Sequence, residues 1–320
     1  MPATGAWSIS GVVMAVSSWS RLGAVAALTM LGVLAPAGAG AEAAGCSQAT
    51  VETVAGARVP LLDWAENAAF DGTGALWVSR TARGVVERYD RSGVSTASVP
   101  VALPGAIRLG PDGLLYVTTG DFPTSALLGN GGVVRFDPAA AQPIPETFVG
   151  GLGMANGADF DAEGNLYVGV TYAGPMRVRP DGSVDTAWTA AVRGALAFDN
   201  LGANGVVVHG DSVYVTLLQS LTGRIMRIPL NDPAHPVVAA DLSPALFAAP
   251  ALPDDLAVGP DGRLYVGTVT GQLVRVDPGT GVGCTVLTGE PITSVTFAPG
   301  SPNELYLTSE VGDLRRVHLG

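Results

Sequence analysis

Four polar residues occupy the same position of a pattern that the sequence repeats six times. After one opening residue, each copy has a short, mainly apolar run, a turn containing Gly, and a second run with a central Trp or Tyr. Carboxylate and amide oxygens are the ligands that hard cations prefer. The opening residues of the six copies are Glu66, Gly105, Asn156, Asn204, Asp254 and Thr293. If these openings lie together, the sequence predicts a divalent cation site made by Glu66, Asn156, Asn204 and Asp254.

The repeat itself indicates how the openings would come together. The central aromatic residues lie roughly 40 to 50 residues apart, which is typical of β-propeller blades, each a small antiparallel sheet. Six copies with four strands each predict an all-β fold, a six-bladed propeller. In such a ring the inner strand of each blade begins at one end of the central channel. The six opening residues would therefore meet around the axis.

The last repeat lacks a fourth strand, because the sequence ends at Gly320 soon after its third run. The segment 48–55 lies before the first repeat and alternates as a strand should. We expect this N-terminal strand to close the last blade. Closure removes the open sheet edge that a linear array would expose.

The same residue types also have an ordinary structural explanation. Asn-Gly pairs and Asp are common where a loop enters a strand. Four such residues in register favour the cation site, and the absence of Cys and His from the set favours Ca²⁺, with Mg²⁺ or another divalent cation as the alternative. The Asp residues of the later turns, Asp71, Asp112 and Asp261, fit hairpin turns and are assigned a structural role.

The composition excludes several classes of partner. The formal net charge is −11, and all 17 basic residues are scattered arginines, so we expect no nucleic-acid partner. Hydrophobic residues make up 48% of the 320 residues, enough for a large core. After residue 45 no apolar run reaches the roughly 20 residues of a membrane span. We expect a monomer that acts on a small molecule, with no membrane contact after signal removal.

The N-terminal segment resembles a secretory signal. Arg21 precedes an apolar run over 22–35, which is followed by small residues that suit cleavage after residue 41. We expect a signal peptide over 1–41, a single propeller domain over 42–320, and a secreted protein. The alternative is a lipoprotein anchored through Cys46, although Ala43 stands where lipid-modification boxes usually carry Leu.

Cys46 and Cys284 are the only cysteines. An exported chain meets an oxidising compartment, where a single pair usually forms a disulfide. We therefore expect this bond at the seam between the last two blades. Two separate thiols remain the alternative, since the sequence does not supply the distance between them.

The order of the predicted ligands resembles the senescence marker protein/gluconolactonase family over about residues 47–320. The residues that carry the resemblance are Glu66, Asn156 with Gly157, Asn204 with Gly205, and Pro253 with Asp254. The resemblance implies a six-bladed propeller related to the calcium-dependent phosphotriesterases. It also implies that these four positions hold the cation and that Asp254 takes part in catalysis.

Two residues depart from the family pattern. Met154 stands where sugar-lactone hydrolases of the family carry Arg, which favours an apolar lactone or ester as substrate. Asp255 follows Asp254 where Gly is usual, and it adds a carboxylate. Strand alternation predicts that Asp255 points to the opposite face from Asp254.

The predicted function is a divalent-metal-dependent hydrolase of lactones or related esters. The cation would polarise the carbonyl, and a water molecule or Asp254 would attack or accept the proton. The alternatives are a non-catalytic secreted propeller with a structural cation, a phosphotriesterase-like hydrolase, and a lyase. The lyase would need a catalytic His, and we expect only surface or packing roles for His209, His235 and His318. Substrate contacts are expected in the loops after each second strand, at Arg80, Asp121, Phe122, Tyr172, Gln219 and Glu310.

Overall fold

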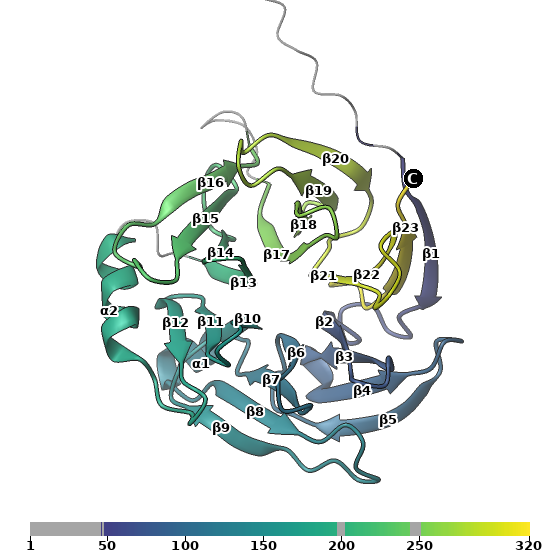
Figure 1. Cartoon of the computed structure of the whole chain (residues 1–320). Coiled ribbons are helices and arrows are strands. Elements are labelled where there is room, and N and C mark those ends of the chain that lie inside the picture. Colours follow the sequence, from purple (N-terminus) through teal and green to yellow (C-terminus); the bar gives the residue numbers. More distant parts are fainter. Residues whose placement is uncertain (1–45, 47, 197–201, 244–250) are drawn as a thin grey trace, which may run out of the picture. The chain divides into compact units, whose positions relative to one another are not determined.

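The six repeats become six antiparallel sheets arranged as blades around a central channel (Figure 1). The computed structural model describes residues 46, 48–196, 202–243 and 251–320. The predicted all-β, six-bladed propeller is confirmed. The predicted signal segment 1–41 lies outside the described residues. No helix in the described ranges is long and apolar enough to cross a membrane.

The strands follow the chain from the inside of each blade to its rim. Blade one contains β2 (Ala65–Phe70), β3 (Leu76–Arg80), β4 (Val85–Tyr89) and β5 (Ser95–Pro100); blade two contains β6 (Ile107–Leu109), β7 (Leu115–Thr119), β8 (Gly132–Phe136) and β9 (Glu146–Gly150). Blade three contains β10 (Ala155–Phe160), β11 (Leu166–Val170) and β12 (Gly174–Val178); blade four contains β13 (Ala203–His209), β14 (Ser212–Leu217), β15 (Arg224–Pro229) and β16 (Val237–Asp241). Blade five contains β17 (Pro253–Val258), β18 (Leu264–Thr268), β19 (Gln272–Val276) and β20 (Gly283–Thr288); blade six contains β21 (Ser294–Phe297), β22 (Glu304–Thr308), β23 (Leu314–His318) and β1 (Thr50–Ala55).

The ring is closed by the N-terminal strand, as predicted. Strand β1 pairs antiparallel with β23, with Val51 opposite Val317, so the edge of β23 is covered. Cys46 and Cys284 form a disulfide with their Cα atoms 5.7 Å apart. This bond ties the segment before β1 to β20, so blades five and six are joined covalently at the seam.

Blade three differs from the prediction of four strands in every repeat. Its place for an outer strand is taken by helix α2 (Thr186–Ala195). Asp185 caps the helix by accepting a hydrogen bond from the backbone of Trp188, and the buried face of α2 includes Trp188 and Val192. An N-cap residue followed by an Ala-rich run favours a helix over a strand, so the four-strand expectation is wrong here.

Blades one, two and five contain the same internal contact between a turn aspartate, an aromatic residue and an arginine. In blade one the Trp77 indole donates to Asp71 at 2.8 Å, and the Arg88 guanidinium lies 5.8 Å from the ring centroid. Equivalent contacts join Tyr116 to Asp112 and Arg135, and Tyr265 to Asp261 and Arg275. The aromatic residue fills the core of the blade while its polar tip is paired, which explains why these residue types recur.

Neighbouring blades pack through aromatic pairs between a second strand and the next inner strand. These pairs are Tyr116 with Phe160, Tyr265 with Phe297, and Tyr306 with Phe70, at centroid distances of 4.9, 5.0 and 5.5 Å. All three have the edge-to-face geometry that aromatic rings prefer. They hold the inner strands at fixed positions around the channel.

Candidate metal centre

The inner strands of four blades contain a β-bulge at the predicted ligand position. In blade one, Ala65 pairs with Arg80 and Ala68 with Val78, so Glu66 and the residue after it lie opposite Ser79 alone. The same shift occurs in β10, β13 and β17, at positions 156–157, 204–205 and 254–255. The paired residues of β6 and β21 show no such shift. Since bulges re-aim side chains, the four blades that open with a predicted ligand share one backbone feature.

Glycine follows two of the ligands because the inner strands come very close together. A Cβ atom on Gly157 would lie 2.2 Å from the carbonyl oxygen of Asn204. A Cβ atom on Gly205 would lie 2.7 Å from the carbonyl oxygen of Asp254. The Asn-Gly pairs of the sequence are therefore needed for strand approach at the channel, in addition to any turn preference.

The bulges bring the predicted ligands into contact across the ring. The amide nitrogen of Asn156 donates to Glu66 Oε1 and to Asp121 Oδ2, both at 3.1 Å. The Asn204 side chain lies near enough to Asp254 to oppose the rise in the pKa of that carboxyl, and the charge of Asp121 acts on the same group. All four predicted ligands are buried. We use the name candidate centre for Glu66, Asp121, Asn156, Asn204 and Asp254.

The carboxylates of the candidate centre are crowded together away from water. Burial, followed by the charges of Asp121 and Asp254, raises the pKa of Glu66 well above its usual value. Burial, followed by the charges of Asp255, Asp121 and Glu310, does the same for the pKa of Asp254. Burial raises the pKa of Asp121 to about 7. The ionised forms of these groups repel one another. A positive ion among them would offset both this repulsion and the cost of burying the charges.

Two oxygen atoms of the candidate centre have no partner in the protein. Asn204 Oδ1 and Asp254 Oδ1 are buried and form no hydrogen bond. Buried acceptors without a donor are costly, whereas both are good ligands for a hard cation. In the described ranges no group of three His, Cys, Asp or Glu side chains could hold a metal by itself, so an ion here would also need the two amides as ligands. The residues present fit one ion of the Ca²⁺ type.

Acidic loop residues enter the centre from the two blades that lack a ligand. Blade two opens with Gly105, and Asp121 of the same blade reaches Asn156 from the loop after β7. Blade six opens with Thr293, whose hydroxyl donates to the Ala65 carbonyl at 2.5 Å and is thus used within the sheets. Glu310, after β22, supplies a charge near Asp254. Asp121, predicted as a substrate contact, is therefore in direct contact with a predicted ligand, Asn156.

The other predicted substrate contacts lie at the surface. Phe122 and Tyr172 are 51% and 48% exposed, and Gln219 is exposed beside Gly202. Phe122 immediately precedes the short helix α1 (Pro123–Leu128), which forms half of the long loop of blade two. These side chains are accessible to a bound molecule, but none of them has a contact with the candidate centre in the described residues.

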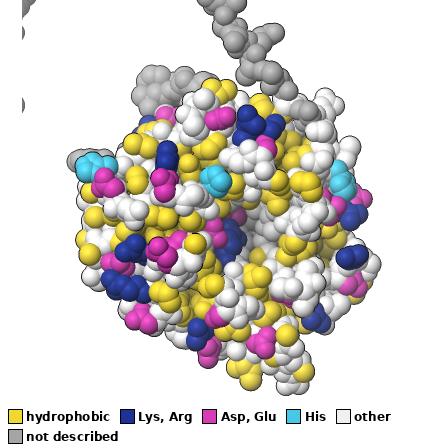
Figure 2. Space-filling view, in the orientation of Figure 1, with side chains coloured by type: hydrophobic (Ala, Val, Ile, Leu, Met, Phe, Trp, Pro, Cys, Tyr) yellow, Lys and Arg dark blue, Asp and Glu magenta, His cyan; other side chains and the backbone are white. Residues whose placement is uncertain are grey.

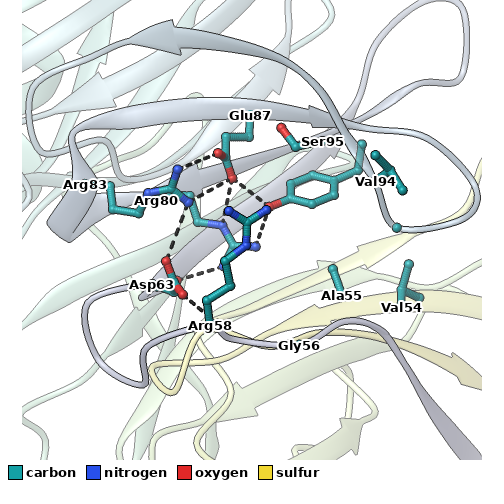
Figure 3. Close-up of a pocket in the computed structure, with 12 residues that line it drawn as sticks. Val54, Ala55, Gly56, Arg58, Asp63, Arg80, Arg83, Glu87, Val94 and Ser95 are labelled. Atoms are coloured by element: carbon teal, nitrogen blue, oxygen red, sulfur yellow. Dashed lines mark hydrogen bonds and ion pairs between the residues drawn. The ribbon is translucent and has the colours of Figure 1, made fainter.

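Arg80 has a structural role in place of the predicted substrate contact. Its guanidinium is buried, at 3% exposure, and donates to the carbonyl oxygens of Asp63 and Gly312 at 2.8 and 2.6 Å. It also donates to the Tyr89 hydroxyl at 2.7 Å and faces Glu87 at 3.4 Å. Figure 3 shows these groups gathered at one wall of a cavity of about 370 Å³ between blades six and one. Arg80 is thus committed to the blade seam.

A second polar cluster in the channel was missed by the sequence analysis. Asn67 donates to Asp255 Oδ2 at 2.9 Å, and Arg108 donates to Asn67 Oδ1 at 3.0 Å. The Arg108 guanidinium lies 3.7 Å from Asp255 and 4.0 Å from Asp159. We call Asn67, Arg108, Asp159 and Asp255 the Arg108 cluster. Figure 2 shows basic and acidic side chains on the wall of the hollow at the centre of the ring.

The Arg108 cluster corrects the prediction for Asp255. Alternation was expected to turn Asp255 away from the face of Asp254, but Asp255 contacts residues from blades one and two. The bulge at 254–255 breaks the alternation on which that prediction depended. The available signal was that Asn67 follows Glu66 just as Asp255 follows Asp254, in the two bulges that lack Gly.

The three histidines lie outside the candidate centre. His209 is exposed at the end of β13, and His318 lies 3.7 Å from Glu304. His235 is exposed and paired with Asp232. None of them is placed to act as the catalytic His that the lyase alternative requires.

Comparison with known proteins agrees with the resemblance seen in the sequence. Residues 153–311 match the family model of the SMP-30/Gluconolactonase/LRE-like region. A gluconolactonase from Xanthomonas campestris is similar in structure, with 16% identity, a TM-score of 0.62, and coverage of 85% of this chain and 90% of that one. No curated protein matches the sequence.

Two further solved structures share the propeller. The calcium-binding protein regucalcin from Agrobacterium tumefaciens has 16% identity and a TM-score of 0.63, covering 86% of this chain and 96% of that one. Virginiamycin B lyase from Staphylococcus aureus has 10% identity and a TM-score of 0.54, and the match covers 85% of this chain and 100% of that one. At such identities these structures show the fold alone. The match over residues 153–311 confirms the resemblance of this chain to the SMP-30/gluconolactonase/LRE-like family.

Proposed function

We propose that the protein is a hydrolase of lactones or related esters whose candidate centre binds one Ca²⁺-type ion. The observation that carries the proposal is the pair of unpartnered oxygens, Asn204 Oδ1 and Asp254 Oδ1, among crowded carboxylates. A ring that needed only to be stable would gain by filling such positions with apolar residues. Their presence favours a site built for a cation.

The side chains of the centre have distinct expected tasks. Glu66, Asn156, Asn204 and Asp254 would hold the ion, and Asp121 keeps Asn156 oriented through its hydrogen bond. A bound divalent ion supplies Lewis-acid polarisation of a carbonyl oxygen. Asp254 has two carboxyl oxygens, so one can face the ion while the other orients a water molecule and accepts its proton.

The surroundings of the centre favour an apolar substrate. Met154 is half-buried directly before β10, at the position where an Arg would suit a sugar lactone. The loop after Asp121 exposes Phe122, Leu127 and Leu128, and the two leucines are 88% and 71% exposed. Apolar side chains exposed beside a site commonly mark a binding surface. We therefore propose alkyl lactones or apolar esters as the substrate class.

The family match supports hydrolysis of the lactone type, and regucalcin, a calcium-binding protein of the same fold, supports the choice of ion. Export is part of the proposal, because the N-terminal sequence has the features of a secretory signal and the two cysteines form a disulfide. We also propose that the protein acts as a monomer on a small molecule.

The test is a hydrolysis screen in CaCl₂ with alkyl lactones, sugar lactones, aryl esters and phosphotriesters. The parent is compared with Asp254→Asn and with Asp261→Asn, which alters a turn carboxylate in the same blade. We expect turnover of alkyl lactones by the parent and by Asp261→Asn only. Equal background rates for all three proteins would favour a binding protein with a structural cation. A preference for sugar lactones would contradict only the apolar substrate.

A further inference from the structure

Asp255 is a buried carboxylate that lies next to a ligand but is turned toward other partners. It is 2% exposed and follows Asp254 within the same bulge. Because the bulge cancels strand alternation, both carboxylates lie on the channel side of β17. Carboxylates are preferred ligands of Ca²⁺, so an ion in the candidate centre would attract Asp255 unless other groups hold it.

Two side chains hold Asp255 by its two oxygens. Asn67 donates to Oδ2 at 2.9 Å, and the Arg108 guanidinium lies 3.7 Å from Oδ1, which has no hydrogen bond. Asn67 is itself fixed, since its Oδ1 accepts from the backbone of Ile107 at 3.1 Å and from Arg108 at 3.0 Å. The contacts join blades one, two and five.

Arg108 is well placed to act as an internal counter-ion. Its side chain is only 16% exposed and points into the ring from β6, with Asp159 of blade three 4.0 Å from its guanidinium. The preceding residue also fixes the Arg108 side chain, because the guanidinium donates to the Ile107 carbonyl at 2.8 Å. A charge held this firmly fixes the direction of the carboxylate that faces it.

We infer that Asn67 and Arg108 are positioning residues that hold Asp255 away from the cation of the candidate centre. The ion then has two carboxylates from the inner strands, Glu66 and Asp254, and keeps a coordination position open for substrate. The inference rests on the proposed function. Releasing Asp255 should add a carboxylate ligand, which tightens Ca²⁺ binding and occupies the open position.

The test is calorimetric titration of metal-free protein with CaCl₂. Arg108→Met should bind Ca²⁺ about tenfold more tightly than the parent, since affinity rises with the number of carboxylate ligands. Adding Asp255→Asn to Arg108→Met should return the affinity to the parental value, which a double-mutant cycle would report as coupling. Arg275→Met is the matched control, because Arg275 is paired with Asp261 outside the channel and its loss should leave the affinity unchanged.

A neutral substitution separates positioning from simple charge. Asn67→Ala removes the donor to Asp255 without changing the net charge, and it should also tighten Ca²⁺ binding. If Arg108→Met does not fold, Asn67→Ala alone decides, with the Ca²⁺-induced rise in Tm as the measurement. Turnover of the lactone should fall in both variants and recover in the combination with Asp255→Asn.

The outcomes distinguish this inference from the proposed function. A parent that binds no Ca²⁺ overturns the cation of the proposed function and the inference with it. A parent that binds Ca²⁺, with unchanged or weaker binding in Arg108→Met and Asn67→Ala, overturns the inference alone. The same holds if Asp255→Asn fails to reverse the tighter binding.

Discussion

Inner strands β2 and β17 carry a carboxylate at each end, and the two carboxylates of each strand are in opposite electrostatic states. At the end where a strand turns back, Asp71 accepts hydrogen bonds from Thr73, Ala75 and Trp77 at 2.6 to 3.0 Å. These bonds outweigh burial and lower the pKa of Asp71. At the end where the strand begins, burial and like charges raise the pKa of Glu66 and Asp254.

The difference lies in where each carboxylate finds its partners. The turn carboxylates are satisfied within their own blade, as Asp261 is by Arg275 and the backbone of Arg263. The opening carboxylates meet other acids and amides across the ring, and Asp254 Oδ1 is left without a hydrogen bond. A carboxylate whose hydrogen bonds are satisfied within its own blade stabilises the fold, whereas a buried carboxylate without such partners points to a bound ligand.

The largest expected effect is on catalysis. Asp254→Asn keeps the shape of the side chain but removes the charge that would orient water and hold the ion, so kcat/KM should fall by about 100-fold or more. Asp261→Asn should leave kcat/KM within about threefold of the parent, because its contacts stay within blade five. Steady-state kinetics on the best substrate of the screen measure both. Equal losses in the two variants would remove the distinction between the strand ends.

The second expected effect is stabilisation by the ion. Binding to the native state alone should raise the free energy of unfolding by about 2.7 kcal/mol at a Ca²⁺ concentration of 100 Kd. Glu66→Gln removes one of the two strand carboxylates and should abolish most of this gain. Thermal melting with CaCl₂ and with chelator measures it, with elemental analysis for bound metal. If neither CaCl₂ nor the chelator changes the Tm of the parent protein, the result contradicts the proposed centre.

The third effect is expected at the turn. Asp71→Asn turns an acceptor of four hydrogen bonds into an amide that cannot accept from all of them, at a cost of about 1–3 kcal/mol in the free energy of unfolding. The gain on adding Ca²⁺ should be unchanged in this variant. Denaturant titration with and without Ca²⁺ measures the two quantities separately. A loss of the Ca²⁺ gain in Asp71→Asn would show that the strand ends are coupled.

Much of the fold was predictable because the repeat expresses one physical unit six times. In blades one, two and five the aromatic residue, the turn Asp and the Arg contact one another, so the spacing of these three residues marks a blade in the sequence. Helix α2 was missed because the expectation of a fourth strand in blade three came from its neighbours, while the local sequence after Asp185 favours a helix.

The four predicted ligand positions stood out because they share one position of the repeat, although only the structure shows that a bulge accompanies each of them. The Arg108 cluster could not be predicted as a whole, since Arg108 and Asp159 share no repeat position with Asn67 and Asp255, and the contacts depend on bulges that alternation does not predict. Arg80 failed as a substrate contact for a related reason. Its partners Asp63 and Gly312 belong to loops whose approach the sequence does not encode locally.

The smallest effect is the pH dependence of the turn carboxylates. The folded-state pKa of Asp71 is lowered, so its ionised form stabilises the fold above the unfolded value of about 3.9, and this contribution is lost as pH falls through the folded-state pKa. The difference in unfolding free energy between the parent and Asp71→Asn should thus be constant from pH 7 to pH 5 and shrink below pH 4.

Urea titrations at pH 7, 5, 4 and 3 in the presence of chelator measure this difference. Glu163→Gln, at an exposed side chain in the equivalent turn of blade three, controls for the loss of one negative charge. A difference that grows as the solution becomes more acidic has the wrong sign for a carboxylate stabilised by hydrogen bonds. Such a result would mean that Asp71, like the acids at the strand openings, is destabilised by its charge in the folded protein.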